Sequence, residues 1–277
     1  MTSGRNGNDR WPFGIRMGVI CAAMLALWAS MTSDALAQRD LSGIVCIVFD
    51  VLRATSSMLT ALAHGAAAIR PVADISEALA IRQQQPDVVL AGERDGLRIR
   101  ADLTGGLDFD LGNSPREFAP EKVRGRTVVM TTTNGTQALR ACLRARTVLI
   151  GAFLNLRALS QWVQREKPSD LLLVCSGTHE EAAYEDALAA GALCDAIWPD
   201  YSAGHVADSA FMACQLFRAA RNDLRAAVGH ARNGRRLLGL AELKDDVPAC
   251  LQRDTLNFVA GFNPQGTVSI LDRAQTR

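Results

Sequence analysis

Short apolar runs alternate with helix-like stretches along the middle of the chain, and this alternation restricts the fold more than any other feature of the sequence. The runs are four to six residues long, which is too short for helices and typical of buried strands. Strands that alternate with helices predict an α/β fold, here a layered α/β/α arrangement with a largely parallel sheet. The strand candidates are 44–49, 67–72, 88–91, 127–130, 147–150 and 171–175, with two later runs at 255–259 and 267–271. Helices are expected near 57–64, 75–84, 134–144, 155–165 and 181–197, and over much of 204–240.

The first of these runs ends abruptly at Asp50, and Arg53, Thr55 and Ser56 follow it before the next apolar stretch. In open parallel sheets, ligands bind beyond the carboxyl ends of the strands, where such turns gather. A helix N-terminus flanked by hydroxyl groups and an arginine suits an anion, and a carboxylate beside it suits a divalent cation. The alternative is structural: Asp50 caps the helix and Arg53 is a solvated charge.

Polar residues also follow three other strand candidates, as a binding site at one edge of the sheet requires. Several of these residue types cap helices in any protein, so a capped helix or a solvated acidic face is the alternative interpretation at each position. The candidates are Glu93 after 88–91, Asn113 and Ser114 farther along that connection, Thr133, Asn134, Gly135 and Thr136 after 127–130, and Gly177, Glu185 and Asp186 after 171–175.

The composition argues against nucleic acid as a partner. Thirty basic and 29 acidic residues give a formal net charge of +1, and aromatic residues make up only 5% of the chain. A basic surface and a base-stacking platform are therefore both unexpected. The seven cysteines form no C-x-x-C pair and lie mostly in apolar runs, as expected of buried thiols in a reduced compartment.

The N-terminus has the order of a secretory signal. Three arginines precede the apolar run 17–29, and Ala35-Leu36-Ala37 resembles a signal-peptidase site. The run is too short to span a membrane comfortably, so no stable membrane span is expected.

Export conflicts with the cysteines, because six unpaired thiols would enter an oxidising space. The alternative is that the true start lies downstream, for example at Met31. Either way, residues 1–37 are expected outside the fold, and 38–277 form one α/β domain. The expected location is the cytoplasm, or outside it if the leader is genuine.

Several common phosphate chemistries lack their signatures. The chain has no G-x-x-x-x-G-K-[ST] motif, no G-x-S-x-G elbow and no H-E-x-x-H pair. Asp50 is followed two positions later by Leu52 instead of the second aspartate of haloacid-type phosphatases. An arginine six positions after Cys175 would suggest a cysteine phosphatase, but that position is Glu181. Cys175 is therefore better explained as a buried thiol than as a nucleophile.

Six motifs occur in a fixed order along the chain: D-V-L-R-A-T-S from Asp50, G-E-R from Gly92, F-D-L-G-N-S-P from Phe109, T-T-N-G-T from Thr132, C-S-G from Cys175, and E-D at Glu185. In this order they resemble the 2-phosphosulfolactate phosphatase family, over about residues 39–262. The resemblance implies a layered α/β/α fold and a magnesium-dependent phosphatase. That enzyme hydrolyses (R)-2-phospho-3-sulfolactate to 3-sulfolactate and phosphate, in coenzyme M synthesis or related sulfonate metabolism.

The chain departs from the family pattern in two places. Gln137 stands where the family usually has an arginine, which removes one contact to an anion. The leader replaces a short strand that the family has ahead of the D-V-L-R-A-T strand, and it has no counterpart in an enzyme that acts on a cytosolic phosphoester.

The resemblance and the need to neutralise a transferring phosphoryl group suggest roles for the candidate residues. We expect Asp50, Glu93 and Asp186 to bind Mg²⁺, and Glu185 to be the base or to support the metal ligands. The catalytic set is then Asp50, Arg53, Glu185 and Asp186. Substrate contacts are expected from Thr55, Ser56, Asn113, Ser114, Thr133, Asn134, Gly135, Thr136, Gly177 and Arg235, with Arg232 and Arg236 as equal alternatives to Arg235.

Two other functions stay open. One is a phosphatase for another small 2-phospho acid, because carboxylate and sulfonate groups require the same kind of donors. The other is a protein that binds an anionic metabolite without turning it over. The sequence also leaves a homo-oligomer open, since the apolar helix near 207–217 suits a subunit interface as well as a core.

Overall fold

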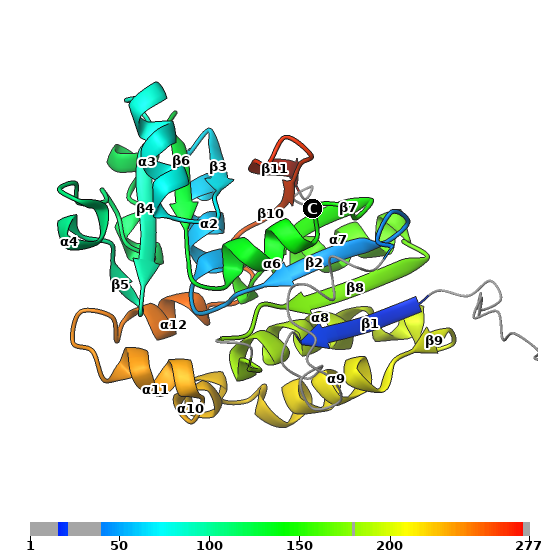
Figure 1. Cartoon of the computed structure of the whole chain (residues 1–277). Helices are drawn as coiled ribbons and strands as arrows, with labels where there is room; N and C mark the ends of the chain where they lie inside the picture. The colour runs from blue at the N-terminus through cyan, green and yellow to red at the C-terminus, as the bar shows by residue number, and fades with distance from the viewer. Residues whose placement is uncertain (1–15, 22–39, 179–180, 274–277) are drawn as a thin grey trace, which may run out of the picture.

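The computed structural model describes residues 16–21, 40–178 and 181–273, which form a mixed sheet with helices on both faces (Figure 1). The α/β class and the layered arrangement predicted from the sequence are confirmed. The described strands are β1 Arg16–Cys21, β2 Val45–Phe49, β3 Ala68–Pro71, β4 Val89–Arg94, β5 Leu97–Arg98, β6 Thr127–Thr131, β7 Thr147–Gly151, β8 Asp170–Cys175, β9 His205–Val206, β10 Phe258–Phe262 and β11 Val268–Arg273. Their order in the sheet is β5–β4–β6–β3–β11–β10–β7–β2–β8–β1–β9.

Two groups of parallel strands make up most of this sheet. One group is β7, β2, β8, β1 and β9, and the other is β4, β6 and β3. The antiparallel hairpin of β10 and β11 joins them, and β11 meets β3 at a single register pair, Val268 with Ile69. Six of the ten pairings between described strands are parallel, as the sequence predicted.

The polar turns meet where the two groups converge and do not lie along one edge of a continuous sheet. In Figure 1, β4 and β6 run crosswise to β2 and β8, and the carboxyl ends of both groups point toward the same region beside α11 (Arg232–Leu238) and α12 (Asp246–Cys250). The sequence analysis expected these turns at one edge of the sheet, but in the structure they lie at the junction between the two groups of strands. The physical reason is the antiparallel hairpin, which separates the groups and lets the sheet turn between them.

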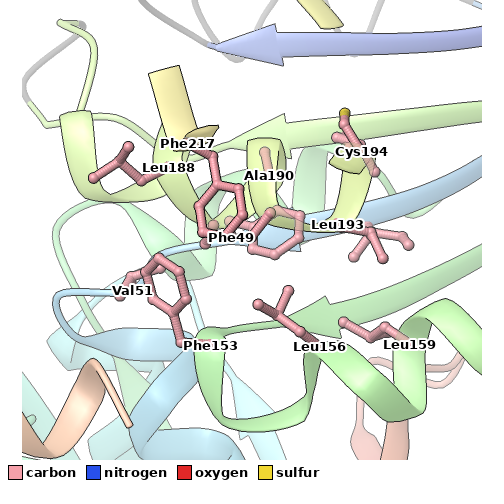
Figure 2. Close-up of a cluster of buried hydrophobic side chains, with 14 of the residues drawn as sticks. Phe49, Val51, Phe153, Leu156, Leu159, Leu188, Ala190, Leu193, Cys194 and Phe217 are labelled. Atoms are coloured by element: carbon pink, nitrogen blue, oxygen red, sulfur yellow. The ribbon is translucent and has the colours of Figure 1, made fainter. Parts of the chain in front are cut away.

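Strand β2 shows why helices cover both faces. Its alternate residues Val45, Ile47 and Phe49 face one hydrophobic core, while Cys46 and Val48 face another. Helices α7 (Leu156–Glu166), α8 (Tyr184–Tyr201) and α9 (Asp208–Ala220) pack on the first core, and α2 (Ala54–Ala63) and α6 (Gly135–Ala141) pack on the second. Figure 2 shows Phe49 among side chains from all three helices of the first core.

The remaining described helices are α3 Ile75–Gln84, α4 Ala101–Thr104, α5 Pro120–Val123 and α10 Leu224–Gly229, together with the short 3₁₀ turns η1 Pro115–Glu117 and η2 Phe153–Asn155. Of these, α3 packs on a third, smaller core over β4 and β6. No helix in the described ranges is both long enough and apolar enough to cross a membrane.

The predicted elements agree with the structure at nearly every position. All six early strand candidates are strands, and the predicted helices are helices with small shifts at their ends. The late candidate 255–259 is displaced, because β10 begins at Phe258.

Strand β1 falls within the segment 1–37 that the sequence analysis placed outside the fold. It pairs in parallel with all six residues of β8 and with β9. An apolar run of this length fits a buried parallel strand as well as the core of a signal. The sequence analysis placed residues 1–37 outside the fold, whereas the structure includes the six residues of β1 in the sheet. The proposed cleavage site and Met31 lie outside the described residues.

Candidate active site

The turn after β2 is held by its own hydroxyl groups. The Thr55 Oγ1 accepts a hydrogen bond from the Asp50 N–H at 3.1 Å and donates one to the Asp50 carbonyl at 2.9 Å. The Ser56 Oγ donates to the Val51 carbonyl at 2.8 Å. Thr55 and Ser56 are fully buried, and their hydroxyl groups bond to the backbone of the turn. The sequence analysis predicted that they bind substrate, whereas in the structure they shape the turn.

Asp50 is a nearly buried carboxylate, 8% exposed, at the carboxyl end of β2. Its Oδ1 accepts a hydrogen bond from the Ala54 N–H at 3.1 Å, and its Oδ2 lies against Gly135. Burial raises the pKa of Asp50 to about 7, and the neighbouring carboxylates of Glu93 and Glu185 add to this rise. A group of acids with a perturbed pKa in a cleft is a common mark of a functional site.

Glu93 joins two of the turns predicted to carry the site. Its Oε1 accepts hydrogen bonds from the Thr133 N–H at 2.8 Å and the Thr133 Oγ1 at 2.9 Å. Its Oε2 accepts one from the Gly96 N–H at 2.7 Å. Asp95 and Gly96 both have positive φ, 53° and 76°, as in the tight two-residue turns that favour Asp-Gly.

Arg53 is buried, 4% exposed, and crosses toward the hairpin turn and α12. Its Nη1 donates to Asp246 Oδ2 at 2.8 Å, and its Nη2 donates to the Gly96 carbonyl at 2.5 Å. Arg53 is therefore not the solvated charge of the alternative interpretation.

Glu185 and Asp186 lie in the first turn of α8 and differ in their surroundings. Glu185 Oε1 accepts a hydrogen bond from Asn233 Nδ2 at 2.6 Å, whereas its Oε2 is buried without a hydrogen-bond partner among the described residues. Burial raises the pKa of Glu185, and the Asn233 amide opposes that rise. Asp186 instead accepts from the Val51 N–H at 2.8 Å and the Gly177 N–H at 3.3 Å, which ties the turn after β2 to the loop after β8.

A small pocket of about 60 Å³ lies between these turns. Three carboxylates and two guanidinium groups line it, together with amides, hydroxyls and two leucines. The lining residues are Asp50, Leu52, Arg53, Glu93, Asp95, Gly96, Asn113, Thr132, Thr133, Asn134, Thr178, Asn233, Arg236 and Leu237. Such a concave site with convergent polar groups is suited to a small polar ligand.

Comparison with known proteins shows the family to which this chain belongs. A family model for 2-phosphosulpholactate phosphatase matches residues 30–264. The chain belongs to this family. The resemblance seen in the ordered motifs is thus confirmed, and the protein is an enzyme of the phosphoric monoester hydrolase class.

Similar proteins carry the name probable 2-phosphosulfolactate phosphatase. The one from Caldicellulosiruptor saccharolyticus is 34% identical over 220 residues, covering 78% of this chain and 88% of the relative. The one from Caldanaerobacter subterraneus is 33% identical over 234 residues, with 82% and 91% covered. The one from Thermotoga petrophila is 36% identical over 213 residues, with 77% and 86% covered.

The structure places six of the fifteen predicted residues of the 2-phosphosulfolactate phosphatase site in the pocket lining. The predicted residues that line it are Asp50, Arg53, Glu93, Asn113, Thr133 and Asn134. Gly135 does not line the pocket but packs against the carboxylate of Asp50, and Glu185 bonds to the lining residue Asn233. The others, which do not line it, are Thr55, Ser56, Ser114, Thr136, Gly177, Asp186 and Arg235.

Arg235 and Arg236 differ because they point to different sides of α11. The Arg235 guanidinium donates to the His230 carbonyl, whereas Arg236 lines the pocket and donates to the Asp95 carbonyl at 2.5 Å. Arg232 pairs with Glu181 and also lies outside the pocket. Among the three alternatives, the structure places Arg236 at the site.

Sequence reasoning missed several residues of the pocket region. The Asp95-Gly96 pair is a recognisable hairpin signal, and it could have been found. Asn233 lies in an arginine-rich segment, and Asp246 lies beside a second aspartate, so neither carries a local signal. Their positions follow from tertiary packing.

The donor set fits a magnesium ion held through few carboxylates. Magnesium usually keeps several waters and binds one or two protein carboxylates. In the part of the chain that the structure describes, no three His, Cys, Asp or Glu side chains are placed to hold a metal by themselves. Asp50 and Glu93 line the pocket, and the unpartnered Oε2 of Glu185 is nearby, whereas Asp186 does not line the pocket and its carboxylate instead ties two loops together.

Proposed function

We propose that the protein is a magnesium-dependent phosphatase that hydrolyses (R)-2-phospho-3-sulfolactate to 3-sulfolactate and phosphate. Family membership and the names of the relatives support the substrate. We further propose that it acts in the cytoplasm, in coenzyme M synthesis or related sulfonate metabolism. Cys46, Cys142, Cys194, Cys214 and Cys250 are buried and form no disulfide, which supports a reducing compartment.

The excess of carboxylates in the pocket is the observation that carries the magnesium requirement. Among the described lining residues, Asp50, Glu93 and Asp95 outnumber Arg53 and Arg236 and give a formal charge of −1, and Glu185 bonds to the lining residue Asn233. A substrate with phosphate, sulfonate and carboxylate groups is strongly anionic and would be repelled by this charge. A divalent cation on the carboxylates would reverse the sign of the field and admit the substrate.

Catalysis then depends mainly on positioning and charge neutralisation. Bound magnesium would be held by Asp50 and Glu93 and would neutralise negative charge on the phosphoryl group. Arg53 and Arg236, which both contact the Asp95-Gly96 turn, are placed to bind anionic oxygens, and Thr133 and Asn134 also line the pocket. Glu185, with a buried free oxygen and a raised pKa, is suited to accept the proton of the attacking water.

The test is phosphate release by the full chain from 2-phosphosulfolactate and a few phospho-hydroxy acids, each with magnesium and with chelator. We expect selective release from 2-phosphosulfolactate that the chelator abolishes. Release from another 2-phospho acid in preference would reassign the substrate. No release by a folded protein that binds the substrate would instead indicate a binding protein.

A further inference from the structure

Asp246 is a fully buried carboxylate that the proposed chemistry does not use directly. It is the first residue of α12, its side chain is 0% exposed, and it does not line the pocket. Burying a charge without partners is costly, so the side chain must be heavily paired.

Three side chains donate hydrogen bonds to Asp246. Arg53 Nη1 donates to Oδ2 at 2.8 Å, while Ser114 Oγ and Arg116 Nε donate to Oδ1 at 2.6 Å and 2.8 Å. The adjacent Asp245 offers a contrast, since its side chain is 62% exposed and lies 3.9 Å from Arg116. Of the two neighbouring aspartates, Asp246 is therefore buried and fully paired, whereas Asp245 is exposed.

The consequence for Arg53 is a fixed orientation. Its guanidinium is planar, and both terminal nitrogens are engaged, Nη1 by Asp246 and Nη2 by the Gly96 carbonyl. Two contacts at opposite corners of a planar group leave little freedom to rotate. The same guanidinium lines the pocket, so its orientation decides which of its N–H groups a ligand meets.

We propose that Asp246 is a positioning residue of the active site, which holds the Arg53 guanidinium in the orientation that binds the phosphoester. The proposal rests on the function proposed above. Asp246 acts through Arg53 and does not touch the substrate. It also separates the charges of Arg53 and Arg116, since both guanidinium groups share this one carboxylate.

Loss of the Asp246 charge should disturb Arg53 more than the fold around it. In Asp246→Asn, the amide keeps the volume but leaves Arg53 and Arg116 without the anion between them. Arg53 would then be free to turn toward the carboxylates of the pocket. Misplacement of a binding group by about 1 Å costs up to about 100-fold in rate, mostly in kcat when the contact forms in the transition state.

The experiment is a double-mutant cycle of Asp246→Asn and Arg53→Ala, measured as kcat and KM with magnesium. We expect Asp246→Asn to lower kcat/KM by about 10-fold or more in the wild-type background, and by less than about 2-fold when Arg53 is already alanine. Asp245→Asn is the matched control and should leave kcat and KM unchanged. If the loss of kcat/KM in the double variant equals the product of the losses in the two single variants, the proposal is overturned, because Asp246 then acts independently of Arg53.

Two further measurements keep the outcome decisive. If Asp246→Asn does not fold, Arg116→Gln/Asp246→Asn removes one charge of each sign, and it should lose about 10-fold or more in kcat/KM relative to Arg116→Gln alone. If the wild type releases phosphate from no substrate, the proposed function fails. The same cycle on the affinity for inorganic phosphate with magnesium then decides the role of Asp246 separately.

Discussion

At the residue scale, the position of Asp50 is fixed from several sides at once. Thr55 bonds to its backbone at both N–H and carbonyl, the Ala54 N–H binds one carboxylate oxygen, and Gly135 lies against the other. A charged group that the interior disfavours is thereby held in one place. Such a fixed, destabilised side chain is typical of active sites, where stability is given up for function.

Gly135→Ala tests this close approach. A Cβ at position 135 would lie 2.6 Å from both Asp50 Oδ2 and the Ala54 Cβ, so one of them must move. We expect activity to fall about 10-fold or more and the free energy of unfolding to fall by about 1–3 kcal/mol. Gly43→Ala is the control, because nothing lies within 4 Å of its added Cβ. Wild-type activity in Gly135→Ala would show that the position of Asp50 Oδ2 is unimportant.

Asp50→Asn separates function from stability. We expect activity to fall by about 100-fold or more, because the carboxylate is lost from the pocket. Burial raises the pKa of Asp50 to about 7, so above that pH the folded state carries a charge that it disfavours. At pH 8 in chelator, the neutral amide should therefore leave the unfolding midpoint unchanged or raise it. Substantial activity in a folded Asn variant would remove Asp50 from the metal site.

Arg53→Ala should affect substrate and metal differently. We expect a large loss of phosphatase activity, about 100-fold, with little or no loss of magnesium affinity, because Arg53 attracts the anionic substrate and does not attract a cation. Titration calorimetry with magnesium, run beside phosphate release, measures both effects. Equal losses would mean that Arg53 organises the metal site.

At the element scale, strands β2, β4, β6, β7 and β8 were predictable because each is a short, mostly apolar run that is buried on both faces over nearly its whole length. The position of Arg236 was not predictable, because neighbouring residues on a helix point about 100° apart and the phase of the short α11 is set by packing. Asp246 was missed for the same reason, since only burial distinguishes it from Asp245. Sequence pattern thus located the turns of the site, whereas tertiary contacts selected the side chains within them.

The packing of α8 against α9 gives a prediction at this scale. A Cβ at Gly191 would lie 2.0 Å from the Ala213 carbonyl oxygen, and backbone cannot move aside as a side chain can. We expect Gly191→Ala to lower the free energy of unfolding by about 1–3 kcal/mol in urea titrations. Gly229→Ala, whose Cβ would meet only Leu238 Cδ1 at 3.8 Å, should change it little. Equal stabilities of the two variants would mean that α8 and α9 can separate freely.

At the scale of the whole molecule, the site exists because two groups of strands point toward one region. Asp50 comes from the group of β2, Glu93 and Thr133 come from the group of β4 and β6, and α11 and α12 cover the junction (Figure 1). The Arg53 contacts to Gly96 and Asp246 connect all three parts. The alternation of strands and helices predicts a largely parallel sheet, but the division into two groups and the angle between them depend on the antiparallel β10–β11 hairpin.

The N-terminal segment is tested by comparing two deletions, of residues 1–15 and of residues 1–37. Only the longer deletion removes β1, which pairs with all six residues of β8 and lies between β8 and β9. Losing β1 exposes the backbone groups of β8 at a new sheet edge, so we expect a lower unfolding midpoint for the longer deletion. Phosphate release should survive in the fraction that stays folded, because none of the lining residues that the structure describes lies in β1, β8 or β9. Equal midpoints for the two deletions would instead mean that the whole segment lies outside the fold, as a leader would.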